Sequence, residues 1–479
     1  MANEPNAKHH ADSAESIFPL PLSPLEKFFF WDDRPELPCT FFIEMRFASS
    51  LDVAVLEKCI ARVVDRNPLL RANVTGDDRH LTWTLNDKPF ALWDLADVPP
   101  IVNGVVRPID LRTDVGCRFW CETTQVCSRV LVQLHHCVCD AIAFRTVVID
   151  ILHLYKLATG NELLSSQDRS LLYDRLNHSL LRERYNFEHL GKPKRETTTW
   201  QRIKNAWYFH FQPPVPLAKL PSNEPTCGAH EETQNPLCNM LMEREFSQRV
   251  LNACQSKAYG VNELAIALLF RTCYQWNRLH GDKRRNGRLR ILMPCDLRGR
   301  ADLRMPATNR LSLSFLGRDY SQCEDLKGLI DSVLAELKDA KETHLYLDLL
   351  KGLELSCRWP RLMKWALARS DSMATAVITY TGDVSRGLNK LFPEVNELRS
   401  VGSASLFAIA GAPPVRRNTN ISLAICINWG RICISASWNR SVFTGQDCSE
   451  FLELYKSGWQ QWCEAEESLR GVYAEPESV

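Results

Sequence analysis

The segment 131–141, Leu-Val-Gln-Leu-His-His-Cys-Val-Cys-Asp-Ala, constrains the fold of this chain more than any other feature. The apolar, partly β-branched residues at 129–134 predict a strand, and apolar residues at helical spacing from Asp140 to about Leu157 predict a helix. An aspartate at such a junction can cap the helix or hold the turn before it. The pattern therefore predicts a strand, a turn that carries His135 and His136, and a helix.

The rest of the chain alternates between the same two kinds of pattern. Strands are predicted at 41–47, 81–85, 290–294, 376–380, 422–429 and 431–438, the last two joined as a hairpin at Gly430. Helices are predicted at 52–65, 247–258, 262–276, 325–341 and 446–462. Asp52 and Asn262 are the expected N-caps of two of these helices, and Pro68 ends the first. This alternation of strand and helix patterns predicts an α/β fold.

The length of 479 residues predicts more than one globular unit. The stretch 191–239 is rich in proline and polar residues, which is typical of a long connection. We therefore expect a disordered tail at 1–17, an N-terminal lobe at 18–190 that carries the two histidines, a linker or crossover at 191–239, and a C-terminal lobe at 240–479.

The overall charge argues against several classes of partner. With a net charge of +1, nothing favours nucleic acid or an acidic membrane surface. No apolar run reaches transmembrane length, and residues 1–16 are too polar for a secretory signal. The 18 cysteines are scattered and form no CxxC pair. We therefore expect a reduced, cytoplasmic monomer without a disulfide framework.

Three interpretations of the histidine turn compete. In the first, His136 is a general base near neutral pH, Asp140 fixes the turn, and the first N–H groups of the helix face a developing oxyanion. In the second, the histidines, Asp140 and the two cysteines bind a metal, although neighbouring strand residues point to opposite faces and no second cluster completes a tetrahedral site. In the third, both histidines are buried structural residues. By strand alternation, His135 is the residue more suited to packing or hydrogen bonding.

The order of several further motifs resembles the condensation-domain and CoA-dependent acyltransferase superfamily. Its HHxxxDG motif resembles residues 135–141, and six other elements resemble segments of this chain in the family's order: 23–31, 65–72, 259–264, the "PVxxR"-like 294–298, the "SNLG"-like 378–382 and the "YDxxLF"-like 438–443. The resemblance runs from about residue 20 to about residue 465. The aromatic group within the first element, 28–31, could line an acyl pocket, and core packing is the preferred interpretation.

This resemblance implies two lobes like chloramphenicol acetyltransferase, with mixed sheets flanked by helices, that meet in a V around a central channel open at both sides. It implies that His136 lies in the middle of the channel, with His135 beside it. It also implies that Asp140 points away from the substrate and pairs with Arg298, as a structural ion pair that supports the catalytic turn.

Three departures from the family pattern concern residues beside the expected channel. Ala141 replaces the glycine of the motif and is small enough for its N–H to approach an oxyanion. Thr381 lies in the altered "SNLG" element. Trp438 and Asn439 replace the Tyr-Asp pair of the late element, and we consider both, with Thr381, as substrate-binding candidates.

The resemblance implies a free-standing acyltransferase in lipid or natural-product biosynthesis. An acyl thioester, carried by coenzyme A or by the phosphopantetheine of an acyl or peptidyl carrier protein, would donate its acyl group to a hydroxyl or amine. The donor would be a substrate, and neither a bound cofactor nor a metal is expected. The alternative is a non-catalytic binding or docking protein that has kept the same fold.

Overall fold

A computed structural model describes residues 15–88, 90–160, 176–198, 200, 202, 207, 209, 211–219, 235–257, 259–369, 373–386 and 388–473. Of the predicted tail, residues 1–14 lie outside the described residues, whereas Glu15–Ile17 forms a 3-10 helix and Ile17 is buried. The predicted linker 191–239 is described only in part. Its end enters the fold as the start of a strand, Cys238–Leu241.

The larger sheet of the described residues joins strands from both halves of the chain. It has seven strands, in the order β14 (Glu394–Val395), β15 (Leu398–Val401), β16 (Ala404–Ala412), β2 (Thr40–Phe47), β9 (Ser128–His135), β8 (Cys117–Thr123) and β5 (Leu92–Asp94). All neighbours are antiparallel except β5 and β8. Because β16 pairs with β2, the C-terminal half of the sequence completes the sheet that carries the histidine strand.

The second large sheet comes from the C-terminal half alone. Its six described strands follow the order β10 (Cys238–Leu241), β18 (Arg431–Trp438), β17 (Ile421–Asn428), β13 (Ala376–Asp383), β11 (Arg288–Asp296) and β12 (Leu311–Asp319). Strand β13 is parallel to both β11 and β17, so the sheet is mixed. Two small sheets complete the described strands: β1 (Leu20–Pro21) with β4 (Thr82–Leu85) and β3 (Ala72–Thr75), and β6 (Ile101–Val102) with β7 (Val105–Val106).

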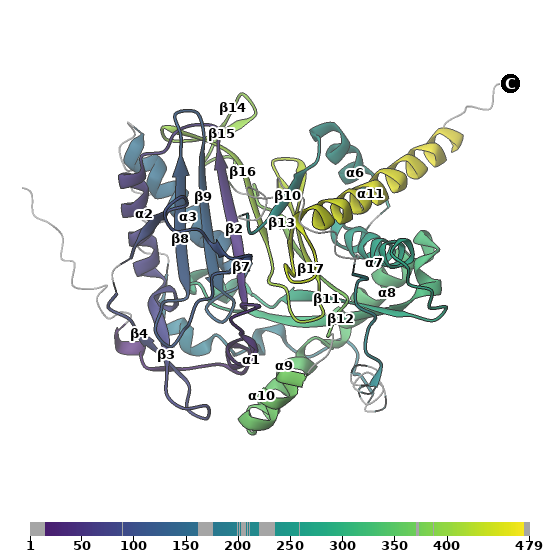
Figure 1. Ribbon diagram of the computed structural model, residues 1–479, viewed down its shortest axis with the longest axis horizontal. Coiled ribbons are helices and arrows are strands. Elements are labelled where there is room, and N and C mark those ends of the chain that lie inside the picture. Colours follow the sequence, from purple (N-terminus) through teal and green to yellow (C-terminus); the bar gives the residue numbers. More distant parts are fainter. Residues whose placement is uncertain are drawn as a thin grey trace, which may run out of the picture.

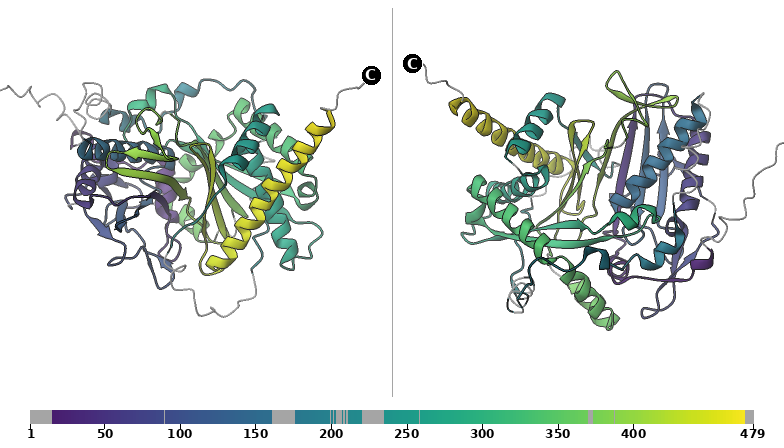
Figure 2. Two further views of the ribbon diagram at one scale, coloured as in Figure 1. Left: turned by 90° about the horizontal axis from the view of Figure 1, so that it is seen from above. Right: turned by 180° about the vertical axis from the view of Figure 1, so that it is seen from behind.

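The helices lie mainly on the outer sides of the two large sheets (Figures 1 and 2). Against the seven-stranded sheet pack α2 (Val53–Arg66) and α3 (Ala141–Thr159), and beyond the six-stranded sheet lie α6 (Arg244–Ser256), α7 (Val261–Leu279), α8 (Leu326–Thr343) and α11 (Gly445–Tyr473). Three further helices, α1 (Pro24–Asp32), α9 (Leu347–Ser356) and α10 (Pro360–Arg369), pack together at one end. The sheets are therefore the inner layers.

Local chemistry explains where the first helices begin. In α2 the buried residues recur at helical spacing, and Asp52 Oδ1 accepts a hydrogen bond from the Val55 N–H at 3.0 Å, as expected for its N-cap. The helix ends at Arg66, before Pro68. The predicted cap of α7 is wrong, because Gly260 is the N-cap residue and Asn262 lies inside the first turn.

The two large sheets touch where β16 packs on β17 and β18. Asn428, at the end of β17, is 2% exposed, and its side-chain amide pairs with the backbone of Ile409 on β16. Asn428 Oδ1 accepts from the Ile409 N–H at 3.1 Å, and Asn428 Nδ2 donates to the Ile409 carbonyl at 2.9 Å. This side chain thus bonds to the edge of β16 as a neighbouring strand would.

Candidate active site

The histidine turn is held on both sides by the strands that flank β9. Strand β9 ends at His135, so His136 lies in the turn and not on the strand. The His135 N–H donates to the Gly116 carbonyl and the His136 N–H donates to the Cys39 carbonyl, both at 2.8 Å. Gly116 has no Cβ, and one placed there would lie 2.0 Å from the Val138 side chain. The turn therefore closes over a position that requires glycine.

His136 lines a cavity and is packed between two phenylalanine rings. The Phe29 ring is stacked on the imidazole with centroids 4.3 Å apart, and the Phe41 ring is tilted against it at 5.2 Å. Burial lowers the pKa of His136 from its ordinary value, and the opposing effects of its own carbonyl group and of Asp140 are smaller. The imidazole is therefore neutral at pH 7, which is the form that accepts a proton.

Asn309 fixes the same turn from the other half of the chain. Its Nδ2 donates to the carbonyls of His136 at 2.8 Å and of Cys137 at 3.0 Å. Asn309 lies just before β12 and is 5% exposed. No motif in the sequence indicates this residue. Because the two accepting carbonyls belong to the catalytic candidate and to the residue after it, Asn309 restricts where the imidazole can lie.

His135 is fully buried and has a different role from His136. Its Nδ1 accepts a hydrogen bond from the Cys137 N–H at 3.1 Å, so its proton is on Nε2, which lies 3.5 Å from Asp33 Oδ2. These contacts lie within the turn and its neighbours. His135 therefore shapes the turn that presents His136.

Asp140 connects the turn to the second half of the chain. Its Oδ1 accepts from the Ala143 N–H at 2.9 Å as the N-cap of α3, and its Oδ2 accepts from Arg298 Nη2 at 2.8 Å and from the Arg310 N–H at 2.9 Å. The ion pair implied by the resemblance is present in the structure. Asp140 is 2% exposed and the Arg298 side chain is 18% exposed, so the carboxylate is the more shielded member of the pair.

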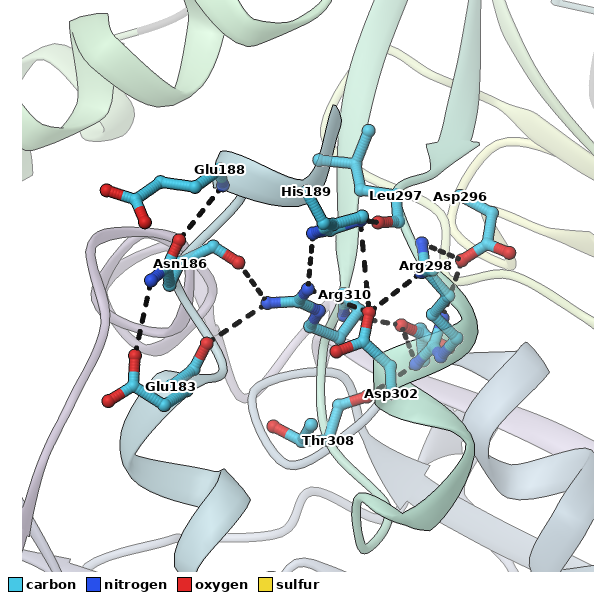
Figure 3. Close-up of polar contacts among 12 residues, drawn as sticks. Glu183, Asn186, Glu188, His189, Asp296, Leu297, Arg298, Asp302, Thr308 and Arg310 are labelled. Carbon is cyan, nitrogen blue, oxygen red and sulfur yellow. Dashed lines mark hydrogen bonds and ion pairs between the residues drawn. The ribbon is translucent and has the colours of Figure 1, made fainter. Parts of the chain in front are cut away.

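A wider polar network surrounds this pair (Figure 3). Arg310 donates to Asp302 Oδ2 at 2.8 Å and to the carbonyls of Glu183 and Asn186 at 3.1 and 2.7 Å. His189 Nε2 lies 2.8 Å from the Leu297 carbonyl. The segment after α3 is therefore bonded to the loop that carries Arg298, and none of these contacts could be read from spacing in the sequence.

Ala141 is the first residue of α3 and lines the same cavity as His136. The first N–H groups of a helix have no carbonyl one turn earlier to accept them, and the helix dipole adds a partial positive charge there. Of these N–H groups, the Asp140 side chain accepts only that of Ala143, the third residue of the helix. The start of α3 is therefore a suitable place for a developing negative charge.

The cavity has a volume of about 220 Å³ and is lined by residues from both large sheets. One buried water needs roughly 10–15 Å³ by the same kind of measure, so the cavity admits a larger molecule. Its lining is mainly apolar and includes Phe28 and Phe29, which also pack in the first core. A channel open at two sides, and the V-shaped arrangement of lobes, stay predictions.

The three substrate-binding candidates from the sequence are not brought together. Thr381, on β13, lines the cavity. Trp438 packs in the core between the six-stranded sheet and its helices, with the Arg440 guanidinium 4.3 Å from its ring centroid. Asn439 is buried in the following turn, where its Oδ1 accepts from the Ser441 hydroxyl at 2.7 Å. Neither Trp438 nor Asn439 lines this cavity.

The cysteines beside the histidines are buried in the first core. Burial raises the pKa of Cys137 and Cys139 well above the ordinary value, which keeps both thiols protonated. Among the described residues, no group of three or more His, Cys, Asp or Glu side chains is arranged to hold a metal ion. The same part of the chain has no helix with both the length and the apolar character needed to cross a bilayer.

Known proteins resemble this chain over part of its sequence and over most of its fold. No protein-family model matches the chain. Over 155 residues, 29% of this chain, it is 26% identical to one of the proteins that make up the linear gramicidin synthase of Brevibacillus parabrevis, and it spans only 2% of that protein's length.

Solved structures match over nearly the whole chain. They include trichothecene 15-O-acetyltransferase TRI3 of Fusarium sporotrichioides (TM-score 0.59, 9% identity, 91% of this chain and 93% of that one). They also include the starter condensation domain of rhizomide synthetase RzmA in complex with C8-CoA (0.56, 12%, 92% and 94%). A third is the epimerization domain from the third module of tyrocidine synthetase B (0.56, 16%, 93% and 97%). The fold predicted by the resemblance is thereby confirmed: the chain has the fold of condensation domains and CoA-dependent acyltransferases.

Proposed function

From this fold and from a neutral histidine in a mainly apolar cavity, we propose that the chain is an acyltransferase that moves an acyl group from a thioester to a hydroxyl or amine. The single observation that carries the proposal is His136, which lines the cavity with a pKa lowered by burial. A base of this kind accepts a proton from the acceptor only when its imidazole is neutral and accessible to substrate.

The proposed reaction has two steps. His136 takes the proton of the acceptor O–H or N–H as the acceptor atom bonds to the thioester carbonyl carbon, which gives a tetrahedral oxyanion. The oxyanion collapses, the C–S bond breaks, and the leaving thiolate takes the proton from His136. The N–H groups at the start of α3, beside Ala141, would stabilise the oxyanion. Neither a covalent enzyme intermediate nor a metal takes part.

The donor and the acceptor are proposed only as classes. Similar folds include an acetyltransferase that acts on a hydroxyl and a condensation domain in complex with C8-CoA. These names support an acyl-CoA donor and a hydroxyl acceptor for this chain. A carrier-bound acyl group is the second donor to test, because the sequence match is to part of a peptide synthase.

The proposal is tested by thiol release from a panel of acyl-CoAs and of phosphopantetheine-linked acyl groups, each with alcohol and amine acceptors. We expect acceptor-dependent thiol release from wild type and its loss, by at least a hundredfold, in His136→Ala. His80→Ala is the matched control, because His80 is exposed and, within the described part of the chain, its ring pairs only with Asp77 in its own loop.

The thermal midpoint of both variants separates catalysis from folding. An unchanged midpoint with lost activity in His136→Ala supports the general base. If wild type binds acyl thioesters without any acceptor-dependent release, the non-catalytic docking function is the correct one.

A further inference from the structure

The cavity carries more positive than negative charge. Five arginines and three aspartates line it: Arg34, Arg145, Arg298, Arg416, Arg417, Asp32, Asp140 and Asp296. All three aspartates are already bonded to arginines. Asp32 pairs with Arg416, and both Asp140 and Asp296 pair with Arg298. The excess charge therefore belongs to the other three arginines.

Arg145 differs from the other two in its surroundings. Arg34 donates to the Leu367 carbonyl at 2.6 Å, and Arg417 is exposed. Arg145 is partly buried, and among the described residues no carboxylate lies within ion-pair distance of it. Its Nε is buried without a hydrogen-bond partner there. An unsatisfied buried N–H of a charged group is costly, which favours a ligand that supplies the missing acceptor.

The position of Arg145 places it close to the proposed chemistry. It lies on α3 four residues after Ala141, so both residues share one face of the helix, one turn apart. Both line the cavity that contains His136. A group bound by Arg145 would therefore belong to a molecule that also reaches the histidine.

We propose that Arg145 binds a carboxylate group of the substrate. This inference rests on the proposed acyl transfer and names the class of molecule transferred: an acyl donor or an acceptor that carries a carboxylate away from its reacting atom. A guanidinium offers paired N–H donors that match the two oxygens of a carboxylate, and the apolar lining strengthens such a bond.

The neighbouring charges favour a monoanion over a phosphate dianion. Burial lowers the pKa of Arg145, and Arg298, whose charge is already offset by its ion pairs with Asp140 and Asp296, acts in the same direction to a smaller extent. Asp296 and Asp383 act in the opposite direction from nearby. Those two carboxylates repel negative charge beside the guanidinium. One carboxylate balances the single charge of Arg145, whereas a dianion would meet additional repulsion.

The binding test compares two probes that differ by one charge, monomethyl suberate and dimethyl suberate, by isothermal titration. We expect wild type to bind the monoanion at least tenfold more tightly than the neutral diester. Arg145→Gln should abolish this preference, and Arg145→Lys should keep part of it. Arg417→Gln is the control that removes an exposed cavity arginine, and it should keep the preference.

Other outcomes overturn the inference. Equal binding of the two probes to wild type overturns it, as does an unchanged preference in Arg145→Gln. If Arg145→Gln does not fold, the Arg145→Lys variant is used instead. A preference for monomethyl suberate as strong as that of wild type in Arg145→Lys would show that the planar guanidinium is not required, and would overturn the inference. Tighter binding of inorganic phosphate than of monomethyl suberate assigns the site to a phosphate and also overturns it.

A second arm identifies which substrate carries the group and separates this inference from the function. Glutaryl-CoA is compared with valeryl-CoA, and 6-hydroxyhexanoate with its methyl ester, in wild type and Arg145→Gln. If the preference between the two acyl-CoAs disappears in Arg145→Gln, the donor carries the carboxylate. If the preference between the two alcohols disappears, the acceptor carries it. His136→Ala should still prefer monomethyl suberate to dimethyl suberate, because Arg145 is unchanged, so a failure of catalysis leaves the test of the charge preference intact.

Discussion

Asp140 and Arg298 meet at 2.8 Å across 158 positions of sequence, and the same Asp140 oxygen accepts the Arg310 N–H. The contact joins the helix cap beside the catalytic candidate to a loop of the other half of the chain. Arg298 also donates to Asp296 at 2.8 Å and to the Thr308 carbonyl at 2.9 Å. The histidine turn is thus supported by groups that sequence proximity does not bring together.

A double-mutant cycle on this pair should show strong coupling. We expect Arg298→Ala to lower the free energy of unfolding by about 3–5 kcal/mol, because it leaves the buried Asp140 carboxylate without its charged partner. Asp140→Ala should lower it by about 1–3 kcal/mol, because it removes the cap of α3 while Arg298 keeps its ion pair with Asp296. The double variant should cost less than the sum of the two by at least about 1 kcal/mol. Urea unfolding of the four proteins measures this, and additive losses would show that the pair is not an interacting unit.

The pH dependence of the reaction should reflect the lowered pKa of His136. Because burial lowers that pKa below the ordinary 6.5, the base stays neutral, and kcat/KM should hold constant as pH falls through 6.5 before it declines. A decline centred at or above 6.5 would contradict the assignment of His136. The measurement is a pH–rate profile of thiol release, over a pH range in which the acceptor itself does not titrate.

The same pKa shift has a consequence for stability. Below pH 6.5 the unfolded chain takes up a proton on this histidine that the folded chain does not, so the unfolded state binds more protons and stability falls as pH falls. His136→Gln should remove this component and lose less stability than wild type as pH falls below 6.5. Unfolding free energies at several pH values measure the difference, and parallel curves for the two proteins would count against it.

How far the sequence predicted the fold depends on the range of each interaction. The strand, turn and helix around Asp140 were predictable because strand patterning and N-capping act over a few residues. Strand β16 was missed, since a short apolar run does not identify its element type and its partner β2 lies in the other half of the chain. The same distance in sequence conceals Asn309, whose two bonds to the histidine turn exist only after folding.

Strand alternation also explains why Trp438 lies away from the cavity. On β18 it shares a face with Ile432, Ile434 and Ala436, which pack against the helices, whereas Cys433 points to the other sheet. The resemblance of residues 438–443 to the family's late element had suggested that Trp438 lies near the channel. The alternation within the strand, which was available in the sequence, places the ring on the opposite face.

The stacking of Phe29 on His136 gives a prediction with a matched neighbour as control. Phe29→Leu should lower kcat and move the acid limb of the pH profile toward 6.5, because a smaller side chain admits water to the imidazole. Phe30→Leu should change neither, since the Phe30 ring lies against Arg112, at 5.0 Å, and not against the histidine. If both variants alter the profile equally, the effect belongs to α1 as a whole and not to the stack.

Asn428 offers a test of the contact between the two large sheets. Two bonds of its side-chain amide join the backbone of Ile409, on a strand of the other sheet, and Nδ2 also donates to Cys426 Sγ at 3.2 Å. The residue is almost fully buried. Asn428→Ala leaves the Ile409 N–H and carbonyl without these partners, so we expect a loss of about 2–4 kcal/mol in the free energy of unfolding. Asn428→Asp keeps the acceptor but loses the donor and buries a charge, so it should be no more stable than the alanine variant. Asn252→Ala, on the exposed face of α6, should cost less than 0.5 kcal/mol, roughly the range for surface sites.

Because the cavity is lined from both sheets, Asn428→Ala should also weaken the binding of monomethyl suberate and of dimethyl suberate by the same factor. Isothermal titration of both probes measures this. A loss confined to the charged probe would place the effect at Arg145 and not at the contact between the sheets.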